Sequence, residues 1–179
     1  MNASHSKSSL FLMEIIIAIL FFSLASAVCL RLFVTAHKMS EKDKDLNNAI
    51  LWSQNLSESF YGCNGKLLMI KNLYPEAFLS NEEIESDGTL ILFFDEDWNL
   101  VDSSLSKASY EAILNIKKAS ANDVYSDVED IKGPLKGNAI TGDITIIDIK
   151  DRSEGYMEVP EDEEYILFTN SVDVYVGKE

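Results

Sequence analysis

The stretch LFLMEIIIAILFFSLASAVCL, residues 10–30, decides the fold of this chain. It is apolar apart from one acid, Glu14, and it lies close to the N-terminus. A helix of this length rises about 30 Å, which is the thickness of the hydrocarbon core of a bilayer. We therefore expect a transmembrane helix over residues 10–30, surrounded by the lipid bilayer.

The one acid in this stretch has two interpretations. A charge inside a bilayer costs free energy, so an intramembrane acid indicates a functional contact with a cation. However, Glu14 lies only about 6 Å along the helix from Leu10, and its carboxylate could instead extend to the headgroups. The residues alone leave both interpretations open.

The helix is expected to continue beyond the apolar stretch, because no glycine or proline occurs from Met1 to Tyr61. Apolar and small residues recur at steps of three, four or seven, which is the pattern of one helix face. The sequence GCNG at 62–65 is typical of a helix C-terminus. We predict an amphipathic continuation over residues 31–61; the alternative is a break near Ser40. The repeating residues are Leu32, Ala36, Met39, Leu46, Ile50, Ser53 and Phe60.

The remainder, residues 62–179, is predicted to be a β-rich acidic head domain. With no long helix between the expected strands, the fold class is α+β: a long N-terminal helix, membrane-spanning in its first half, packed against an antiparallel β-sheet. In the strand at 110–117, alternating residues predict one buried and one exposed face. Runs of β-branched and aromatic residues predict the strands at 89–94, 98–101, 110–117, 143–150 and 165–176. We further expect a turn at 95–97, a short helix or strand at 66–73, a helical turn within 75–85, and loops at 119–138 and 152–164.

The charge of the head limits its partners. After Asp45 the chain carries 26 acids and ten bases, so this part has a net charge near −16. Such a domain is repelled by phosphate backbones, and we expect no nucleic acid among its partners.

No catalytic motif, metal-ligand set or cofactor motif is recognisable. The chain has two cysteines, Cys29 inside the apolar stretch and Cys63 beyond it, which support neither a disulfide scaffold nor a zinc site. Asp95-x-Asp97-x-Asn99 lacks the glycine and glutamate of an EF-hand loop and predicts an acidic turn. We therefore expect no enzymatic activity, no metal and no cofactor, and we interpret Trp52 and Trp98 as core residues.

Residues 9–20, SLFLMEIIIAIL, follow a short polar leader, MNASHSKSS. This arrangement resembles the N-terminus of type IV pilins and type II secretion pseudopilins, in which a small residue precedes an apolar helix with glutamate at its fifth position. Counting from Leu10, Glu14 is fifth. The resemblance implies a leader over 1–9, cleavage between Ser9 and Leu10 by a prepilin peptidase, methylation of the new amine, and pairing of Glu14 with the amine of a neighbouring subunit.

The resemblance also implies a function: a structural subunit of a type IV pilus or type II secretion-like assembly, whose partners are other pilin-like subunits. Ser9, Leu10 and Phe11 depart from the Gly, Phe and Thr usual in this family, which favours a minor component. We expect a single-pass membrane protein with its N-terminus in the cytoplasm and its head outside. The alternative function is an anchored extracytoplasmic domain that binds a protein and does not polymerise.

Two observations favour other placements of the chain. Only one lysine precedes the apolar stretch, whereas four bases follow it by residue 44, which favours a cytoplasmic head under the positive-inside rule. Ala25-Ser26-Ala27 also fits a signal-peptide cleavage site, although the apolar run continues past it.

Overall fold

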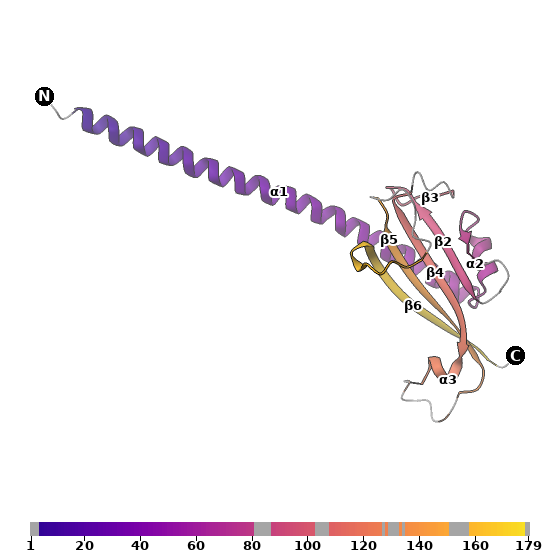
Figure 1. The fold of residues 1–179 in the computed structure, drawn as a ribbon. Helices are drawn as coiled ribbons and strands as arrows, with labels where there is room; N and C mark the ends of the chain where they lie inside the picture. The colour runs from indigo at the N-terminus through magenta and orange to yellow at the C-terminus, as the bar shows by residue number, and fades with distance from the viewer. Residues whose placement is uncertain are drawn as a thin grey trace. The chain divides into compact units, whose positions relative to one another are not determined.

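The computed structural model describes residues 4–80, 87–102, 108–126, 128, 133, 135–150 and 158–177, with side chains from Ser9 onward. The chain divides into two units, residues 1–44 and 45–179. Helix α1, Ser4–Gly62, is helical at every residue, so the predicted continuation beyond the apolar stretch is confirmed and the alternative, a break near Ser40, is wrong. The helix also begins inside the stretch expected as a leader (Figure 1).

The C-terminal end of α1 is set by a glycine turn. The backbone N–H of Gly65 donates to the carbonyl of Phe60 at 2.9 Å, and Asn64 and Gly65 have φ values of 52° and 69°. Residues in this left-handed conformation stop helices, as the sequence predicted. A Cβ at Gly65 would lie 2.7 Å from Cγ2 of Ile140, so the position also requires the absence of a side chain.

The second unit contains one antiparallel sheet, which confirms the α+β fold class. Its strand order is β1-β2-β4-β5-β6, with β3 paired to β2 (Figure 1). Among the described residues, short helical segments accompany the sheet: α2, Leu67–Leu73; α3, Ala121–Val124; and a 3-10 turn, Glu163–Tyr165. The strands are β1, Phe78–Leu79; β2, Gly88–Phe94; β3, Leu100–Val101; β4, Tyr110–Ser120; β5, Asn138–Asp148; and β6, Ile166–Gly177.

Several local predictions need correction. Within 75–85, a turn closed by the hydrogen bond from the Ala77 N–H to the Tyr74 carbonyl leads into strand β1, which the sequence did not predict and which pairs with β2; residues 81–86 lie outside the described chain. The ends of the expected 119–138 loop belong to β4 and β5, which pair in register from Tyr110↔Asp148 to Ser120↔Asn138. That pairing supplies backbone hydrogen bonds even where the side chains are polar.

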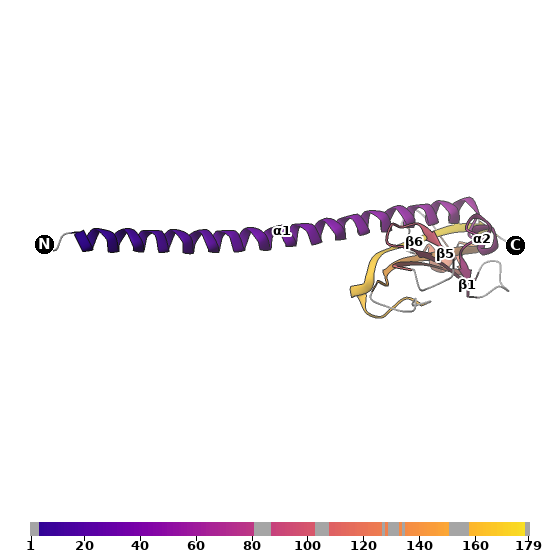
Figure 2. The same ribbon diagram turned by 90° about the horizontal axis from the view of Figure 1, so that it is seen from above.

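The main core lies between the second half of α1 and one face of the sheet (Figure 2). Ala49, Leu56 and Phe60 of α1 are fully buried there. Gly142 of β5 lies directly beneath Phe60, where a Cβ would approach the aromatic ring to 3.0 Å. The sheet residues of this core include Leu90, Leu92, Phe94, Ala112, Leu114, Ile116, Ile144 and Ile146.

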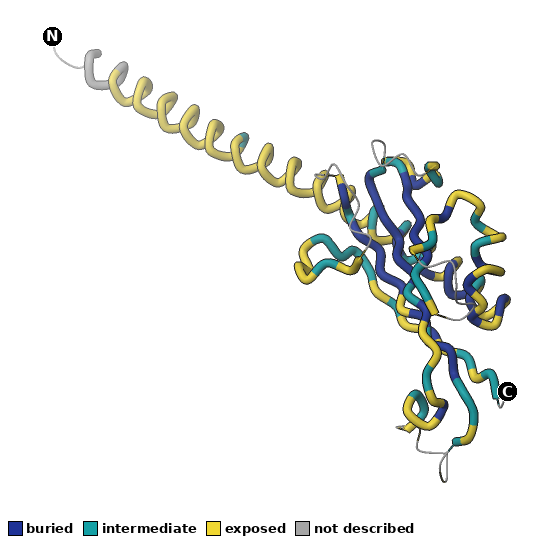
Figure 3. The backbone as a smooth tube through the Cα atoms, turned by 45° about the vertical axis from the view of Figure 1, so that its right-hand side comes forward, coloured by how far each residue is buried: buried dark blue, intermediate teal, exposed yellow. Residues whose placement is uncertain are grey.

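The opposite face of the sheet is also covered, which the alternating pattern of β4 did not indicate. Ile113 packs in a second apolar cluster with Ile91, Phe93 and Ile147. Glu111, expected on an exposed face, is fully buried. Strand β4 is therefore buried on both faces through its first five residues (Figure 3), since two apolar clusters enclose the sheet.

Candidate functional site

The first unit contains Ser9, Leu10 and Glu14, the residues that the sequence predicted for processing and assembly. The large apolar side chains from Leu10 to Leu30 are exposed, and Figure 3 shows this part of α1 almost entirely in the exposed colour. The helix is long and apolar enough to cross a membrane. Leu10 and Glu14 are four residues apart and thus share one helix face. No described side chain forms a salt bridge with Glu14.

In the second unit, a polar cluster that the sequence did not reveal surrounds the first residue of this unit. Tyr110 Oη donates to Asp45 Oδ1 at 2.6 Å, and Lys150 Nζ donates to Asp45 Oδ2 at 2.8 Å. The ammonium of Lys150 lies 4.4 Å from the centre of the Tyr110 ring. Trp98 stacks on that ring with 3.9 Å between centroids. We call Asp45, Trp98, Tyr110 and Lys150 the Asp45 cluster.

The turn between β2 and β3 places Trp98 in this cluster. Asp95 Oδ1 accepts hydrogen bonds from the backbone N–H groups of Asp97 and Asn99, both at 2.9 Å. Trp98 takes a φ of 63°, an uncommon value for a residue other than glycine. The predicted acidic turn is thus confirmed, and its carboxylate holds backbone amides.

The electrostatics of the Asp45 cluster favour its charged pair. Burial raises the pKa of Asp45, but the hydrogen bonds from Lys150 and Tyr110 outweigh it, so the pKa lies below the usual value. Burial opposes the charge of Lys150, yet the hydrogen bond to Asp45 raises its pKa overall. Burial and the nearby carboxylate raise the pKa of Tyr110 to about 12. The Trp98 indole is close enough to help lower the pKa of Asp45, although its buried Nε1–H makes no hydrogen bond of good geometry.

This cluster connects helix to sheet, since Asp45 lies on α1 and Tyr110 on β4. Sequence reasoning missed it because Tyr110 and Lys150 lie 65 and 105 residues from Asp45. The available signal was the acid itself, which directly precedes the buried face of the helix. The tryptophans were predicted more successfully: Trp98 is buried, and Trp52 packs on Phe94 with 4.6 Å between ring centroids.

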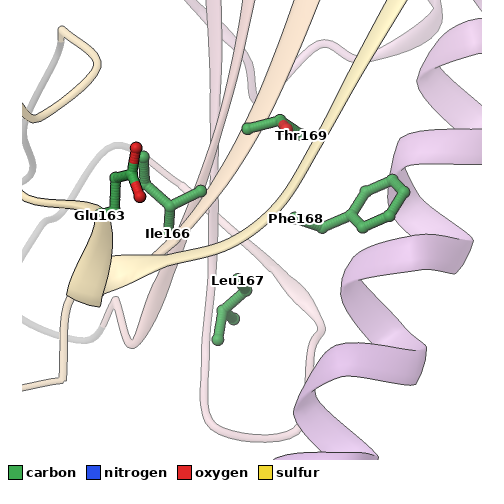
Figure 4. A pocket seen from close by; sticks show the side chains of 5 residues that line it. All are labelled: Glu163, Ile166, Leu167, Phe168 and Thr169. Atoms are coloured by element: carbon green, nitrogen blue, oxygen red, sulfur yellow. The ribbon is translucent and has the colours of Figure 1, made fainter.

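A cleft opens where β6 begins. It has a volume of about 470 Å³ and is lined by Glu163, Ile166, Leu167, Phe168 and Thr169. Phe168 points toward α1, whereas Glu163 and Ile166 lie on the other side of the strand (Figure 4). Glu163 lines the cleft, and the adjacent Asp162 and Glu164 are exposed, so the cleft combines apolar side chains with acidic ones. We call it the acidic cleft.

The described residues do not contain three histidine, cysteine, aspartate or glutamate side chains placed to hold one metal ion. Cys63 is buried, and burial raises the pKa of its thiol. Cys29 is exposed on the apolar part of α1.

Comparison with known proteins assigns no family to the chain: no family model, curated protein or solved structure gives a significant match. The architecture, a long apolar helix followed by an antiparallel sheet packed on its second half, is pilin-like.

Proposed function

We propose that this protein is a membrane-anchored, pilin-like structural subunit, a minor component of a type IV pilus or type II secretion-like assembly. The observation that supports this most is the division of α1. One unbroken helix is apolar and exposed over residues 10–30, yet supplies fully buried core residues at Ala49, Leu56 and Phe60. A separate anchor joined to a receptor domain by a linker would not need such a helix.

In this proposal the first half of α1 enters a bundle of similar helices in the bilayer. A glutamate in hydrocarbon needs a cation, and none of the described side chains of its own chain forms a salt bridge with Glu14. Cleavage after Ser9 creates an ammonium group on Leu10. The carboxylate of Glu14 then pairs with the Leu10 amine of a neighbouring subunit, while the acidic head is displayed outside the cell.

The direct test is self-association of the full chain after extraction of membranes with mild detergent. Tagged and untagged wild-type copies should co-isolate, and Glu14→Gln should reduce the co-isolated fraction at least about tenfold, since a desolvated ion pair exceeds about 1.4 kcal/mol. Glu41→Gln, a matched change on the same helix outside the apolar stretch, should have little effect. Equal co-isolation of Glu14→Gln and wild type would show that Glu14 is no assembly contact.

The competing proposal is a single-pass anchored domain that binds a protein partner and remains monomeric. It predicts no co-isolation of tagged and untagged wild-type copies under any extraction condition. Under that proposal, Glu14→Gln leaves the behaviour of the protein unchanged.

A further inference from the structure

The turn after α1 and helix α2 form a surface unlike the rest of the head. Residues 61–75 contain two lysines and no acid, although the part of the chain after Asp45 carries 26 acids and ten bases. Leu67 and Ile70 of α2 are buried, but Leu68, Met69 and Leu73 are 42%, 49% and 58% exposed. Helix α2 therefore has apolar side chains both on its buried face and on the face exposed to solvent. We call Lys66, Leu68, Met69, Lys71 and Leu73 the α2 surface.

The acidic cleft has the opposite character. Its lining includes the apolar residues Ile166, Leu167 and Phe168, which are partly buried, together with Glu163; the neighbouring Asp162 and Glu164 are also exposed. A volume of about 470 Å³ accommodates several apolar side chains. The acidic cleft is an open depression with a mixed apolar and acidic lining, whereas the α2 surface combines exposed apolar side chains with two lysines. The two surfaces therefore match in both hydrophobicity and charge.

These surfaces lie at opposite edges of the same sheet. Helix α2 contacts β2, beside the edge strand β1, while the cleft is formed by the start of β6, the strand at the other end of the order (Figure 1). They therefore belong to different sides of the head and are free to engage two different neighbours. A contact between two unlike surfaces of identical chains generates a ring when the rotation between copies closes, and an open row or helical filament when it does not.

We propose that the α2 surface of one copy docks into the acidic cleft of a second copy, with Lys66 facing Glu163 and Leu68 and Met69 entering the cleft. This inference deepens the proposed function and rests on it in one respect: both copies are anchored in the same membrane. Anchoring raises the effective concentration of the heads, so a contact of modest area is sufficient. The helices and the heads then make separate contacts in one assembly.

The test is cysteine crosslinking of the full chain in membranes. All variants carry Cys29→Ala, which removes the exposed native thiol, whereas Cys63 is buried. One chain carries Met69→Cys and a second carries Thr169→Cys. Oxidation should give crosslinked dimers when the two chains are co-expressed and at most about one-fifth as much from either chain alone, because the contact joins unlike surfaces. Equal yields from each single variant, or no dimer from the pair, would overturn the proposal.

Charge reversal provides the matched controls. Glu163→Lys and Lys66→Glu should each lower the dimer yield about fivefold. The dimer yield should be restored when the two reversals are combined, with Lys66→Glu on the Met69→Cys chain and Glu163→Lys on the Thr169→Cys chain. Glu96→Lys and Lys117→Glu, exposed residues outside both surfaces, should leave the yield within about twofold of the parent. Failure of the paired reversal to restore the yield would contradict the contact between Lys66 and Glu163.

Measuring the mature N-terminus and the effect of Glu14→Gln in the same membranes separates this inference from the proposed function. If the chain is processed and its association depends on Glu14, but no crosslink forms, then only the proposed contact between the heads is contradicted. If the specific crosslink forms, but the chain is unprocessed and associates independently of Glu14, then the head contact is supported and the pilin-like assembly is contradicted.

Discussion

The two halves of α1 place the same secondary structure in opposite environments. Residues 10–30 expose apolar side chains on every side, whereas Ala49, Leu56 and Phe60 are fully buried against the sheet. A helix that is apolar all round suits a membrane, and a helix with one apolar stripe suits the surface of a sheet. The comparison shows that the distribution of apolar residues around the helix, not helix formation itself, decides the role of each half.

The largest expected difference between the halves comes from two phenylalanine truncations. Phe60→Ala removes a fully buried ring and should lower the free energy of unfolding of the head by about 3–5 kcal/mol. Phe22→Ala, whose side chain is 74% exposed, should change this free energy by less than about 0.5 kcal/mol. Denaturant titration of the full chain in detergent, followed by the fluorescence of Trp52 and Trp98, measures both. Similar losses in the two variants would contradict the division of α1.

A smaller effect tests how closely the second half of α1 approaches the sheet. In Gly142→Ala the added Cβ lies 3.0 Å from both the Phe60 ring and Cγ2 of Val172, so the variant should lose about 1–3 kcal/mol of stability. Gly62→Ala adds a methyl group with no heavy atom within 4 Å and serves as the control. Unchanged stability in Gly142→Ala would show that the helix and sheet are not packed at this distance.

The Asp45 cluster tests where the buried half of the helix begins. Asp45→Asn keeps the shape of the side chain but removes the negative charge that accepts the hydrogen bond from Lys150. The free energy of unfolding should fall by about 1–2 kcal/mol; the loss is no larger because Lys150 is partly exposed. Asp43→Asn, an exposed acid two residues earlier, should change the same denaturation midpoint very little. If Asp43→Asn lowers the free energy of unfolding as much as Asp45→Asn does, the Asp45 cluster has no special role in stability.

The pH dependence of that loss follows from the shifted pKa values. The pKa of Asp45 is lower in the folded head than in the unfolded chain, so its contribution is fully present above the ordinary pKa of 3.8 and is lost as the pH falls through the folded value. The stability difference between wild type and Asp45→Asn should therefore shrink below about pH 4. At the alkaline end, the pKa of Tyr110 rises to about 12, so its contribution is present below about pH 10 and is lost toward pH 12. If the stability difference between wild type and Asp45→Asn instead grew below about pH 4, the pKa of Asp45 would be raised by folding rather than lowered.

The sequence predicted the elements with strong periodicity and missed those that depend on partners far along the chain. The apolar run, the helical stripe to Phe60 and the glycine stop at residues 62–65 were readable because each is local. Strand β1 and the first residues of β5 were missed, because pairing with neighbouring strands stabilises them more than their own side chains do. The Asp45 cluster and the burial of Glu111 depend on segments that are distant in sequence, and periodicity carries no information about them.

The most direct test of the central claim, that α1 is the processed spine of a pilin-like subunit, is the mass of the mature N-terminal peptide. The full chain is expressed with a prepilin peptidase, and with an inactive peptidase as the control, and is then recovered from membranes. If α1 is such a spine, the recovered chain begins at Leu10 only when the peptidase is active, with or without one added methyl group. Recovery of Met1 alone in both cases, or of a chain that begins at Val28, would contradict it.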